Sequence, residues 1–441
     1  YKYYNKKGRP YIMKRFVTLL IVCVTLCCVV LVAKDSLSKR DTIANNTQYP
    51  VDTTTESYTN TITTTTEPVT TPNNSYQALN FEYQKAMWFA FMDYSSILMD
   101  NSEEQFTNYI TQRFSNAKDL GINTVYVQVR SHADSYYKST IYTKGKYYNT
   151  DYDPLKIMVD VAHQYGLSIH AWINPMRCMS TEGMESMSND YLVKQWYNSN
   201  RGTLINEYNG YWYLNPYYDE VNTLICDGIA EILNGYQVDG INIDDYFYPT
   251  TDTEFDSEAF SQSGQSNLSQ FRRDNVTTMI SKMYSTIKNI NNTVQFGISP
   301  QGNIYTDYEE LYADVYTWTS NTGYCDYIAP QIYYGFNNST CPFQSTVDEW
   351  VSLTKDSPVK LLIGICTYKI GTEDTWAGSG SNEWIENPNV ASNEVLSCLN
   401  NSYIDGVALY SYASTFEPAT EVSNLVDAER SAIQKALTET E

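Results

Sequence analysis

Short apolar segments alternate with helix-like segments from about residue 86 to the end of the chain. Each apolar segment is a nearly continuous hydrophobic run, which is typical of strands that are buried on both faces. The segments are KAMWFAFMDY, NTVYVQVR, LSIHAWINPMR, DGINIDD, VQFGISP, DYIAPQIYYG, VKLLIGICTY and DGVALYSYAS. The intervening segments carry helix signals, such as Pro154 in the first turn and Gly166 at the end of PLKIMVDVAHQYG. This alternation predicts parallel strands connected by helices.

Eight strand–helix units predict one closed barrel, so the expected fold class is α/β, a (β/α)8 TIM barrel over residues 80–441. An open doubly wound sheet is the alternative, but no glycine-rich phosphate loop supports it. In a barrel the functional residues lie at the C-terminal ends of the strands. The polar and aromatic residues at these ends are Arg130, His132, Asp134, Trp172, Asn174, Arg177, Asp244, Asp245, Tyr246, Tyr248, Ser299, Gln301, Gln331, Tyr333, Tyr334, Thr367, Tyr368, Tyr410 and Tyr412.

The fourth apolar segment, within DGINIDDYFYP, ends in two adjacent carboxylates, Asp244 and Asp245. Successive residues of a strand point to opposite faces, so the two can share a cleft only if the strand ends there and the chain turns. A carboxylate pair among amides and aromatic rings suits a sugar ligand. Cleavage of a glycosidic bond needs one carboxyl to protonate the leaving oxygen and a second group to stabilise the oxocarbenium-like centre.

Composition narrows the classes of ligand. The net charge of −22 disfavours a nucleic-acid partner, because phosphate binding needs basic patches. The 41 tyrosines offer flat apolar faces that suit sugars, although many must simply pack. The three histidines and the scattered cysteines disfavour a metal site, and no cofactor is expected. Cys325 and Cys341 flank one predicted strand and its loop, so they are the first pair to examine for a disulfide.

The N-terminal part predicts attachment to a membrane. A basic tail, residues 1–15, precedes the apolar run at residues 16–33, which is just long enough to span a bilayer. The Lys and Arg residues before it place the N-terminus in the cytoplasm. We therefore expect a single-pass signal anchor with an extracellular catalytic domain; a cleaved signal peptide, which would give a secreted protein, is the alternative. Residues 34–79 are rich in Thr and Ser and predict a disordered linker.

Several segments together resemble the glycosyl hydrolase-like 10 family over roughly residues 86–413. They are GINTVYVQVRSHADSYYKS, DYDPLKIMVDVAHQYGLSIHAWINPMR, WYLNP, DGINIDDYFYP, FRRDNV, FGISPQGN and DYIAPQIYYG, in the family's order. The resemblance implies an exported (β/α)8 glycosidase that acts on a polysaccharide or oligosaccharide, in particular an N-acetylated cell-wall glycan of the peptidoglycan type. The chain departs from the family at Asn242, where His is frequent, and at Phe271, where Trp is frequent.

Two mechanisms are open for the aspartate pair. In the first, Asp244 is the nucleophile and an acid on another loop, Asp134 or Glu373, protonates the leaving group. In the second, the pair resembles the adjacent carboxylates of several N-acetylhexosaminidase families, whose substrates supply their own acetamide as the nucleophile. Asp244 would then orient the acetamido group and Asp245 would be the general acid/base, with a pKa raised by burial and by its neighbour. We favour the second.

The candidate substrate-binding residues share a position at or near the strand ends. They are Arg130, Asp134, Trp172, Asn174, Arg177, Asn242, Tyr246, Tyr248, Arg273, Ser299, Gln331 and Tyr333.

Other polar residues are expected to have structural roles. Asp239, Asp326 and Asp405 begin predicted strands, where a carboxylate usually caps a turn. His170 is expected to be a hydrogen-bonded core histidine. One of the two arginines Arg272 and Arg273 is expected to form a structural ion pair and the other to face substrate.

Three classes of function are therefore compatible with the sequence. The first is a glycoside hydrolase that acts on an N-acetylated cell-wall glycan. The second is a non-catalytic wall-binding protein that keeps the same cleft. The third is another carbohydrate-active lyase or esterase, but the chain contains no GxSxG nucleophile motif.

Overall fold

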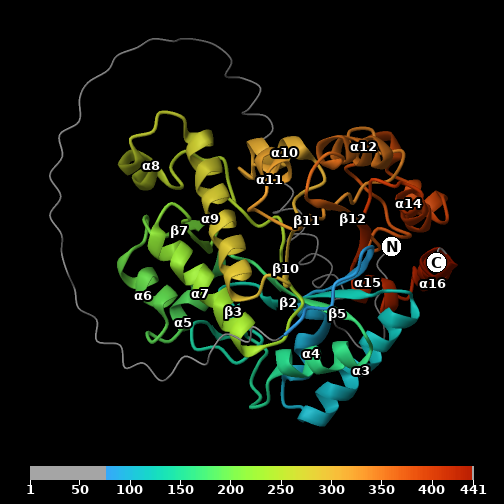
Figure 1. Ribbon diagram of the computed structural model, residues 1–441, viewed down its shortest axis with the longest axis horizontal. Helices are drawn as coiled ribbons and strands as arrows, with labels where there is room; N and C mark the ends of the chain where they lie inside the picture. The colour runs from blue at the N-terminus through green and yellow to red at the C-terminus, as the bar shows by residue number, and fades with distance from the viewer. Residues whose placement is uncertain (1–75, 440–441) are drawn as a thin grey trace, which may run out of the picture. The chain divides into compact units, whose positions relative to one another are not determined.

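The computed structural model of this protein describes residues 76–439. The predicted basic tail, membrane segment and nearly all of the predicted linker lie outside these residues. Eight parallel strands form a closed barrel in the order β1-β13-β12-β11-β10-β9-β5-β2 (Figure 1). The strands are β1 (Gln84–Phe89), β2 (Thr124–Arg130), β5 (Ser168–Ile173), β9 (Gly240–Ile243), β10 (Gln295–Ile298), β11 (Tyr327–Ile328), β12 (Lys360–Cys366) and β13 (Gly406–Tyr410). The predicted (β/α)8 barrel is confirmed.

A helix or a pair of helices follows each barrel strand and packs on its outer face (Figure 1). These helices are α3 (Glu103–Asp119), α4 (Pro154–Gln164), α7 (Asp219–Gly235), α9 (Leu268–Ile290), α10 (Ile304–Glu309) with α11 (Val315–Ser320), α12 (Phe343–Thr354), α14 (Val390–Leu399) and α16 (Ser423–Glu439). The signals around α4 act as predicted: Pro154 is its first residue, and Gly166 just beyond its end has φ +64°.

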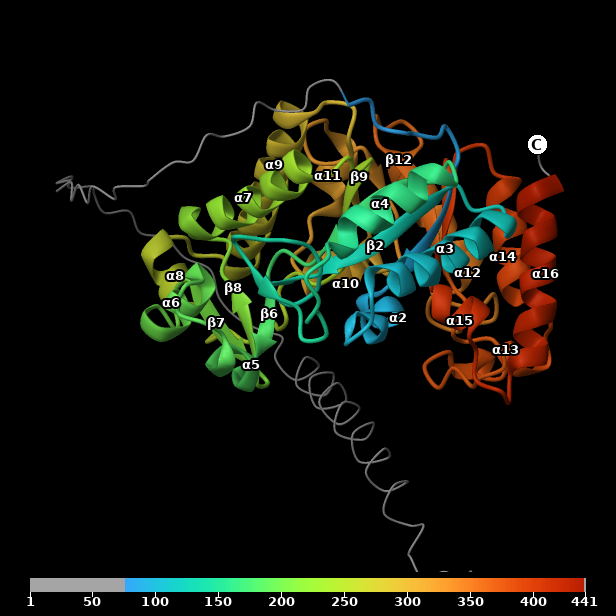
Figure 2. The ribbon, with the colours of Figure 1, turned by 90° about the horizontal axis from the view of Figure 1, so that it is seen from below.

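A small three-stranded sheet is inserted after β5. It consists of β6 (Arg177–Ser180), β8 (Tyr211–Leu214) and β7 (Ile205–Tyr208), with α5 (Thr181–Ser186) and α6 (Leu192–Ser199) beside it. Figures 1 and 2 both show this insertion on the side of the barrel away from α14 and α16. The predicted third strand therefore runs too far, because Arg177 belongs to β6. Pro175 lies between the two strands and has no N–H for a ladder hydrogen bond.

Short elements occupy the remaining loops. They are α2 (Phe91–Tyr94), η1 (Ser95–Leu98), β3 (Asp134–Ser135), β4 (Thr143–Lys144), α8 (Ser257–Ser263), η2 (Gly378–Gly380), α13 (Glu383–Glu386) and α15 (Tyr412–Phe416). The first and eighth predicted strands accordingly end earlier than expected, at Phe89 and Tyr410, and continue into α2 and α15.

The interior of the barrel is filled with side chains. A cluster of small and aromatic residues points inward from the strands: Ala86, Trp88, Ala90, Tyr126, Trp172, Tyr327, Ala329, Leu362 and Ala408. His170 lies among them as expected, with Nδ1 2.9 Å from the Tyr327 hydroxyl, and burial lowers its pKa to about 4. Since the centre is filled, it leaves no room for a ligand inside the barrel.

Aspartates seal the N-terminal end of the barrel, as predicted. Asp239 is fully buried and accepts hydrogen bonds from the backbone N–H of Leu79 and Ile169 and from the Tyr76 hydroxyl. Asp326 and Asp405 likewise accept the backbone N–H of a neighbouring strand. Residues 76–79, which the sequence assigned to the linker, thus lie on the base of the barrel.

Two further points from the sequence analysis, the Cys325–Cys341 pair and membrane-spanning helices, can be compared with the described residues. Cys325 and Cys341 are not bonded to each other, and the six cysteines between residues 76 and 439 are all free thiols. No helix within this range is long and apolar enough to cross a membrane. The run at residues 16–33 lies outside the range.

Candidate active site

A cavity of ≈ 700 Å³ opens at the C-terminal ends of the barrel strands. The lining residues are Trp88, Ala90, Phe91, Met92, Gln128, His132, Trp172, Arg177, Asp244, Asp245, Tyr246, Gln301, Gln331, Tyr333, Tyr334, Asn338, Thr340, Cys341, Tyr368, Lys369, Asp374, Trp376 and Tyr410. The volume is in the range of small-molecule and oligosaccharide sites, about 300–1,000 Å³.

Every barrel strand, or the loop that follows it, thus contributes at least one side chain to this cavity.

Both aspartates of the adjacent pair lie in the cavity. Strand β9 ends at Ile243, and the chain then turns, with the Phe247 N–H donating to the Asp245 carbonyl at 2.9 Å. Because the alternation of the strand stops before Asp244, the two side chains do not have to point to opposite faces. Asp244 is only 4% exposed, whereas Asp245 is half-buried.

Asp244 is held by three N–H donors. Asn174 Nδ2 donates to both carboxylate oxygens at 2.8 and 2.9 Å, Trp172 Nε1 donates at 3.1 Å, and the Tyr246 backbone N–H donates at 3.3 Å. Asn174 is oriented in turn by Gln128, whose Nε2 donates to its Oδ1 at 2.9 Å. Hydrogen bonds from N–H groups favour the ionised form of a carboxyl, so these donors fix the position of Asp244 and partly oppose the effect of its burial on its pKa.

Asp245 has different surroundings. Its carboxylate accepts hydrogen bonds from the side-chain amides of Gln301 and Gln331, the second at 3.1 Å. Gln331 is itself anchored, because its Nε2 also donates to the Ser299 carbonyl at 3.0 Å. These amides leave the side of Asp245 that faces the cavity open. Asp245 is therefore the member of the pair that a ligand can reach with less rearrangement.

The two carboxyls titrate at higher pH than exposed aspartates. Burial and the neighbouring Asp245 raise the pKa of Asp244 to about 7. Burial also raises the pKa of Asp245, against the amide hydrogen bonds from Gln331 and Gln301. Two adjacent carboxyls in a site of low dielectric resist ionising together, so the pair holds one proton over a pH range in which an exposed aspartate holds none.

Asn242 and Ser299 lie beneath the pair and outside the cavity lining. Asn242 Nδ2 donates to Ser299 Oγ and to the Tyr327 hydroxyl, both at 3.2 Å, and Asn242 Oδ1 accepts from Trp88 Nε1 at 3.4 Å. These two candidates for substrate binding thus form part of the floor. They join the filled interior of the barrel to the site above it.

Aromatic and basic side chains form the walls. Tyr333 stacks on Tyr410 with ring centroids 5.7 Å apart, and Tyr368 meets Tyr333 edge-on at 6.0 Å. On another wall the Arg177 guanidinium lies 4.3 Å from the ring centroid of Tyr246. His132 lies near this wall, and burial followed by the charge of Arg177 lowers its pKa to about 4, so its ring is neutral at neutral pH. Aromatic faces beside polar groups are the surfaces on which sugars bind.

Besides Asn174, Asn242 and Ser299, four more of the predicted substrate-binding residues lie outside the cavity lining. Arg130 points outward, with its guanidinium 4.4 Å from the Tyr142 ring centroid. A bulge between Gln128 and Arg130 shifts the register of β2, so Arg130 leaves the inward face on which Tyr126 and Gln128 lie. Asp134 caps its own turn by accepting the N–H groups of Ser131 and His132.

Tyr248 and Arg273 are the other two predicted substrate-binding residues that lie outside the cavity lining. Tyr248 is buried, with its ring 5.4 Å from that of Tyr312. Arg273 donates to the Tyr308 carbonyl at 3.1 Å and stacks on the same tyrosine, so neither it nor Arg272 faces the cavity. The expectation that one of these arginines forms a structural ion pair is met by Arg272.

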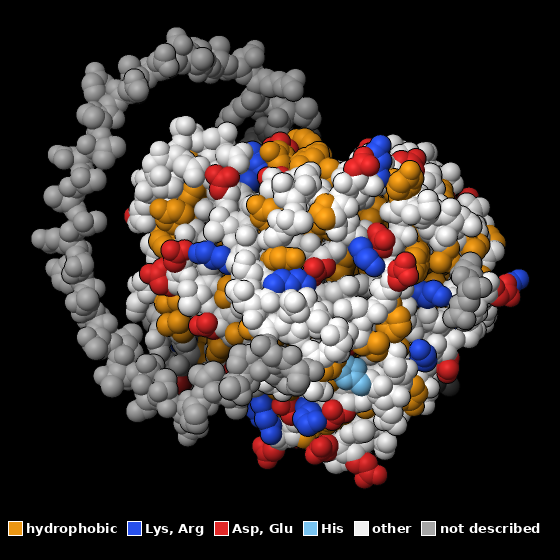
Figure 3. All heavy atoms as spheres, viewed as in Figure 1, with side chains coloured by type: hydrophobic (Ala, Val, Ile, Leu, Met, Phe, Trp, Pro, Cys, Tyr) orange, Lys and Arg blue, Asp and Glu red, His pale blue; other side chains and the backbone are white. Residues whose placement is uncertain are grey.

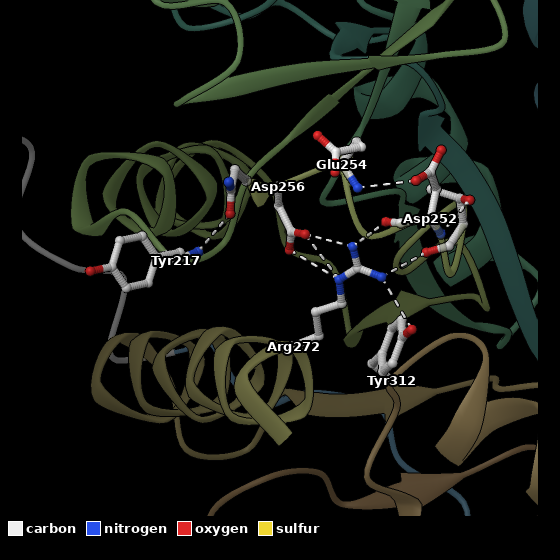
Figure 4. Close-up of polar contacts among 8 residues, drawn as sticks. Tyr217, Asp252, Glu254, Asp256, Arg272 and Tyr312 are labelled. Atoms are coloured by element: carbon white, nitrogen blue, oxygen red, sulfur yellow. Dashed lines mark hydrogen bonds and ion pairs between the residues drawn. The ribbon is translucent and has the colours of Figure 1, made fainter. Parts of the chain in front are cut away.

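Arg272 holds the loop that follows the aspartate pair (Figure 4). Its side chain and that of Asp256 are fully buried, and its Nη2 lies 2.6 Å from Asp256 Oδ1. The remaining donors reach the Thr250 and Asp252 carbonyls and the Tyr312 hydroxyl. The guanidinium therefore ties helix α9 to the loop between β9 and α8 and fixes where that loop leaves the strand.

The proposed acids on other loops do not lie in the cavity. Asp134 is occupied in its turn, and Glu373 is exposed outside the lining. Asp374, the next residue, does line the cavity, but it forms an ion pair with Lys369 at 2.6 Å. Among residues 76–439 no group of three or more His, Cys, Asp or Glu side chains is arranged to hold a metal ion.

Several lining residues were not among the candidates from the sequence. Gln128 could have been found, because it is a polar residue at an inward position of a strand, two residues after Tyr126. Gln301 belonged to the polar residues noted at the strand ends but was not selected. Asp374 and Trp376 come from a long loop after β12, where no periodic pattern indicates which side chains turn inward.

The family follows from comparison with known proteins. The sequence model of the family described as "Glycosyl hydrolase-like 10" matches residues 84–378. This chain belongs to the glycosyl hydrolase-like 10 family. The matched segment contains all the barrel strands except β13 and includes the aspartate pair. The resemblance drawn from the sequence motifs is thereby confirmed.

Two curated relatives are similar in sequence. Glycosyl hydrolase YngK of Bacillus subtilis is 32% identical over 317 residues, which cover 65% of this chain and 61% of that protein. Glycosyl hydrolase DigH of Escherichia coli K12 is 33% identical over 288 residues, which cover 57% of this chain and 64% of that protein. The chain thus spans less than two thirds of the length of either relative.

Two solved structures share the fold. The glycoside hydrolase domain of PgaB (BpsB) from Bordetella bronchiseptica superposes with a TM-score of 0.52 at 10% identity, covering 79% of this chain and 99% of that one. Alpha-L-fucosidase isoenzyme 2 from Paenibacillus thiaminolyticus superposes with a TM-score of 0.50 at 15% identity, covering 81% of this chain and 49% of that one. At such identities the likeness concerns the fold alone.

Proposed function

We propose that this protein is a glycoside hydrolase that cleaves an N-acetylated cell-wall glycan of the peptidoglycan type at Asp244 and Asp245. The observation that carries the proposal is the pair itself: two adjacent carboxyls in one cavity, in unlike surroundings. Asp244 is fixed by three N–H donors, and Asp245 is open to the cavity. Pairs of titratable groups whose environments differ are the usual basis for dividing acid and base roles.

The proposed reaction begins with protonation of the glycosidic oxygen by Asp245. As the bond to the leaving sugar breaks, the carbonyl oxygen of the substrate's acetamido group attacks the anomeric carbon. Asp244 accepts a hydrogen bond from the acetamido N–H and stabilises the positive charge that develops there. Asp245 then takes a proton from water, and the water oxygen opens the cyclic intermediate. Two displacements at the same carbon retain the anomeric configuration.

The position of the other carboxyls supports this route over direct attack by Asp244. Direct attack requires a separate acid on another loop. Asp134 and Glu373 lie outside the cavity lining, and the carboxylate of Asp374 is neutralised by Lys369. In the acetamide-assisted route the adjacent pair supplies both functions, so no third carboxyl is needed.

The test is mass spectrometry of the products formed from peptide-free wall glycan by the purified full chain. Asp244→Asn and Asp245→Asn are the test variants, and Asp356→Asn is the matched control, because Asp356 is exposed at the opposite end of the barrel. We expect new oligosaccharides from the wild type and the control, and at least about 100-fold less from each test variant. Unchanged products from Asp245→Asn would contradict its role as the acid.

Two other outcomes separate the alternatives. Glycan binding without products in any variant would favour a non-catalytic wall-binding protein with the same cleft. Cleavage of glycans that lack acetamido groups, at a rate equal to that of acetylated ones, would exclude the substrate-assisted route. In that case Asp244 as the nucleophile would be the mechanism to examine.

We also propose that the apolar run at residues 16–33 anchors the chain in the cell membrane, with the barrel on the outer side. Its length and the preceding basic residues support this placement. Protease added to intact cells should then remove the barrel while the anchor segment stays with the membrane fraction. Recovery of the whole barrel from the medium would instead indicate a cleaved signal peptide.

A further inference from the structure

An exposed tryptophan stands at the edge of the candidate active site. Trp376 lines the cavity and is 59% exposed, in the loop between β12 and α13. Most of the other cavity aromatics are at least half-buried in the walls. A large apolar ring that remains mostly exposed at the mouth of a polar cavity is placed to contact a ligand.

The loop presents Trp376 in a fixed position. The Trp376 backbone N–H donates to Asp374 Oδ1 at 3.2 Å, and Asp374 is held by its ion pair with Lys369. Lys369 Nζ also donates to the Tyr333 carbonyl at 2.7 Å. The next residue, Ala377, accepts the backbone N–H of Ser339 at 3.0 Å from the neighbouring loop. Hydrogen bonds therefore hold the chain on both sides of the Trp376 ring, as a preorganised binding surface requires.

A second exposed aromatic residue lies at another edge. Tyr246 is 43% exposed and is covered on one face by Arg177. It follows the aspartate pair on the loop after β9, whereas Trp376 follows β12. Strands β10 and β11 separate β9 from β12 in the barrel, so the two aromatic rings mark well-separated parts of the mouth. The aspartate pair lies at the Tyr246 side.

We propose that Trp376 is a sugar-stacking platform, which binds a unit of the glycan on the far side of the cavity from Asp244 and Asp245. The glycan would then cross the mouth from Tyr246 to Trp376, with sugar units on both sides of the bond that is cut. The enzyme would cleave internal bonds of a chain rather than release terminal sugars. This inference rests on the proposed function and adds to it the mode of action and a residue that determines it.

The chemistry of the surroundings supports a sugar at this position. The flat face of a pyranose carries C–H groups that pack on an aromatic ring, while its hydroxyls need polar partners at the edge. Asn338, Thr340 and Lys369 lie in the same part of the lining and supply amide, hydroxyl and ammonium groups. The Tyr368 ring, 46% exposed, provides a second apolar surface beside Trp376 in the lining.

The first experiment measures binding as a function of glycan length. The full chain carrying Asp245→Asn, which binds without turnover, is titrated with β-1,4-linked N-acetylglucosamine oligomers from the disaccharide to the hexasaccharide. Trp376→Ala is added to this background, and Tyr403→Ala is the matched control, because Tyr403 is exposed outside the cavity. We expect Trp376→Ala to weaken binding of the long oligomers about three- to tenfold while the disaccharide is unaffected.

The second experiment follows early products from the hexasaccharide with otherwise wild-type protein. Internal cleavage predicts mid-sized fragments before any terminal sugar accumulates, and Trp376→Ala should raise KM for long substrates with little change in kcat. Unchanged affinity of Trp376→Ala for the long oligomers, or exclusive release of terminal sugars, would overturn the inference while leaving the hydrolase intact. Absence of binding and of products for every oligomer and for peptide-free wall glycan would refute the proposed function, and the inference with it.

Discussion

At the scale of single residues, two neighbouring aspartates acquire different properties from their hydrogen-bond partners. Asp244 accepts from Asn174, Trp172 and a backbone N–H, and Asp245 accepts from two glutamine side chains. Burial raises the pKa of both carboxyls, and the charge of Asp245 raises that of Asp244 further. The chemistry of the site therefore depends on the amides that surround the pair as much as on the carboxyls.

The first prediction concerns the dependence of activity on pH. A carboxyl with a raised pKa is protonated below that pKa and loses its proton as the pH rises through it. Since Asp245 supplies the acid and burial raises its pKa, kcat/KM should fall on the alkaline side at a higher pH than that at which an exposed aspartate titrates. The measurement is kcat/KM for peptide-free glycan as a function of pH. A rate that stays flat up to the titration of lysine would contradict the assignment.

The second prediction concerns Asn174. Asn174→Ala removes the donor that contacts both oxygens of Asp244, so the ionised form loses stabilisation and the pKa of the pair should rise further. A hydrogen bond to a charged group contributes about 1.5–3 kcal/mol, so kcat should fall about 10- to 150-fold with little change in KM. Asn149→Ala is the control, since Asn149 is an exposed amide. A change in KM alone would mean that Asn174 binds substrate rather than positioning Asp244.

At the scale of elements, the loop after β9 is kept in place by helix α9. The contact is the buried pair of Arg272 and Asp256, with further bonds from Arg272 to two loop carbonyls (Figure 4). The loop begins at Asp244, so the ion pair acts on the geometry of the site from a distance. The aspartates occupy a strand end, but a helix on the outer layer determines the path that the chain takes beyond them.

The third prediction concerns this ion pair. Arg272→Met leaves Asp256 buried without its partner and should reduce the free energy of unfolding by about 3–5 kcal/mol. The double variant Arg272→Met with Asp256→Leu removes both charges and should recover part of that loss. Lys156→Met is the control, because Lys156 and Asp160 form an exposed pair that contributes within about 0.5 kcal/mol. Chemical denaturation measures all of them, and an Arg272→Met loss as small as the control's would contradict a structural role.

At the scale of the whole molecule, the two ends of the barrel differ in structure. The C-terminal end carries the cavity, and the N-terminal end is sealed by aspartates that bind backbone N–H groups. Acidic and basic side chains are interspersed on the face shown in Figure 3, and they do not gather there into one basic patch. This distribution agrees with the net charge of −22, which disfavours a polyanionic nucleic-acid partner.

The fourth prediction concerns the base of the barrel. A chain that begins at residue 81 lacks Tyr76 and Leu79, which both donate to the buried carboxylate of Asp239. It should be less stable than a chain that begins at residue 76 by about 1–3 kcal/mol, because part of this carboxylate is left unpaired. Tyr76→Phe removes one of these hydrogen bonds and should give a smaller loss. Thermal unfolding provides the comparison, and equal melting temperatures would show that residues 76–80 do not support the barrel.

The fold class and the end of the barrel with the candidate site could be predicted from the amino-acid sequence. Alternating strand and helix segments indicate a barrel, and a parallel barrel gathers its strand ends at one edge, so the polar residues there could be predicted to include the site. Asp244, Asp245, Trp172 and Gln331 were placed correctly in the cavity for this reason. The capping roles of Asp239, Asp326 and Asp405 were likewise predicted, from their positions at the beginnings of strands.

Which of the residues near the strand ends turn inward could be learned only from the folded chain. A bulge in β2 turns Arg130 away from the inward face, and contacts with Asp256 and Tyr308 keep Arg272 and Arg273 out of the cavity. Trp376 reaches the cavity through a long loop. Beyond the end of a strand, the direction of a side chain depends on the path of the loop and on contacts with distant segments. Local periodicity carries no information about either, so these assignments required the folded chain.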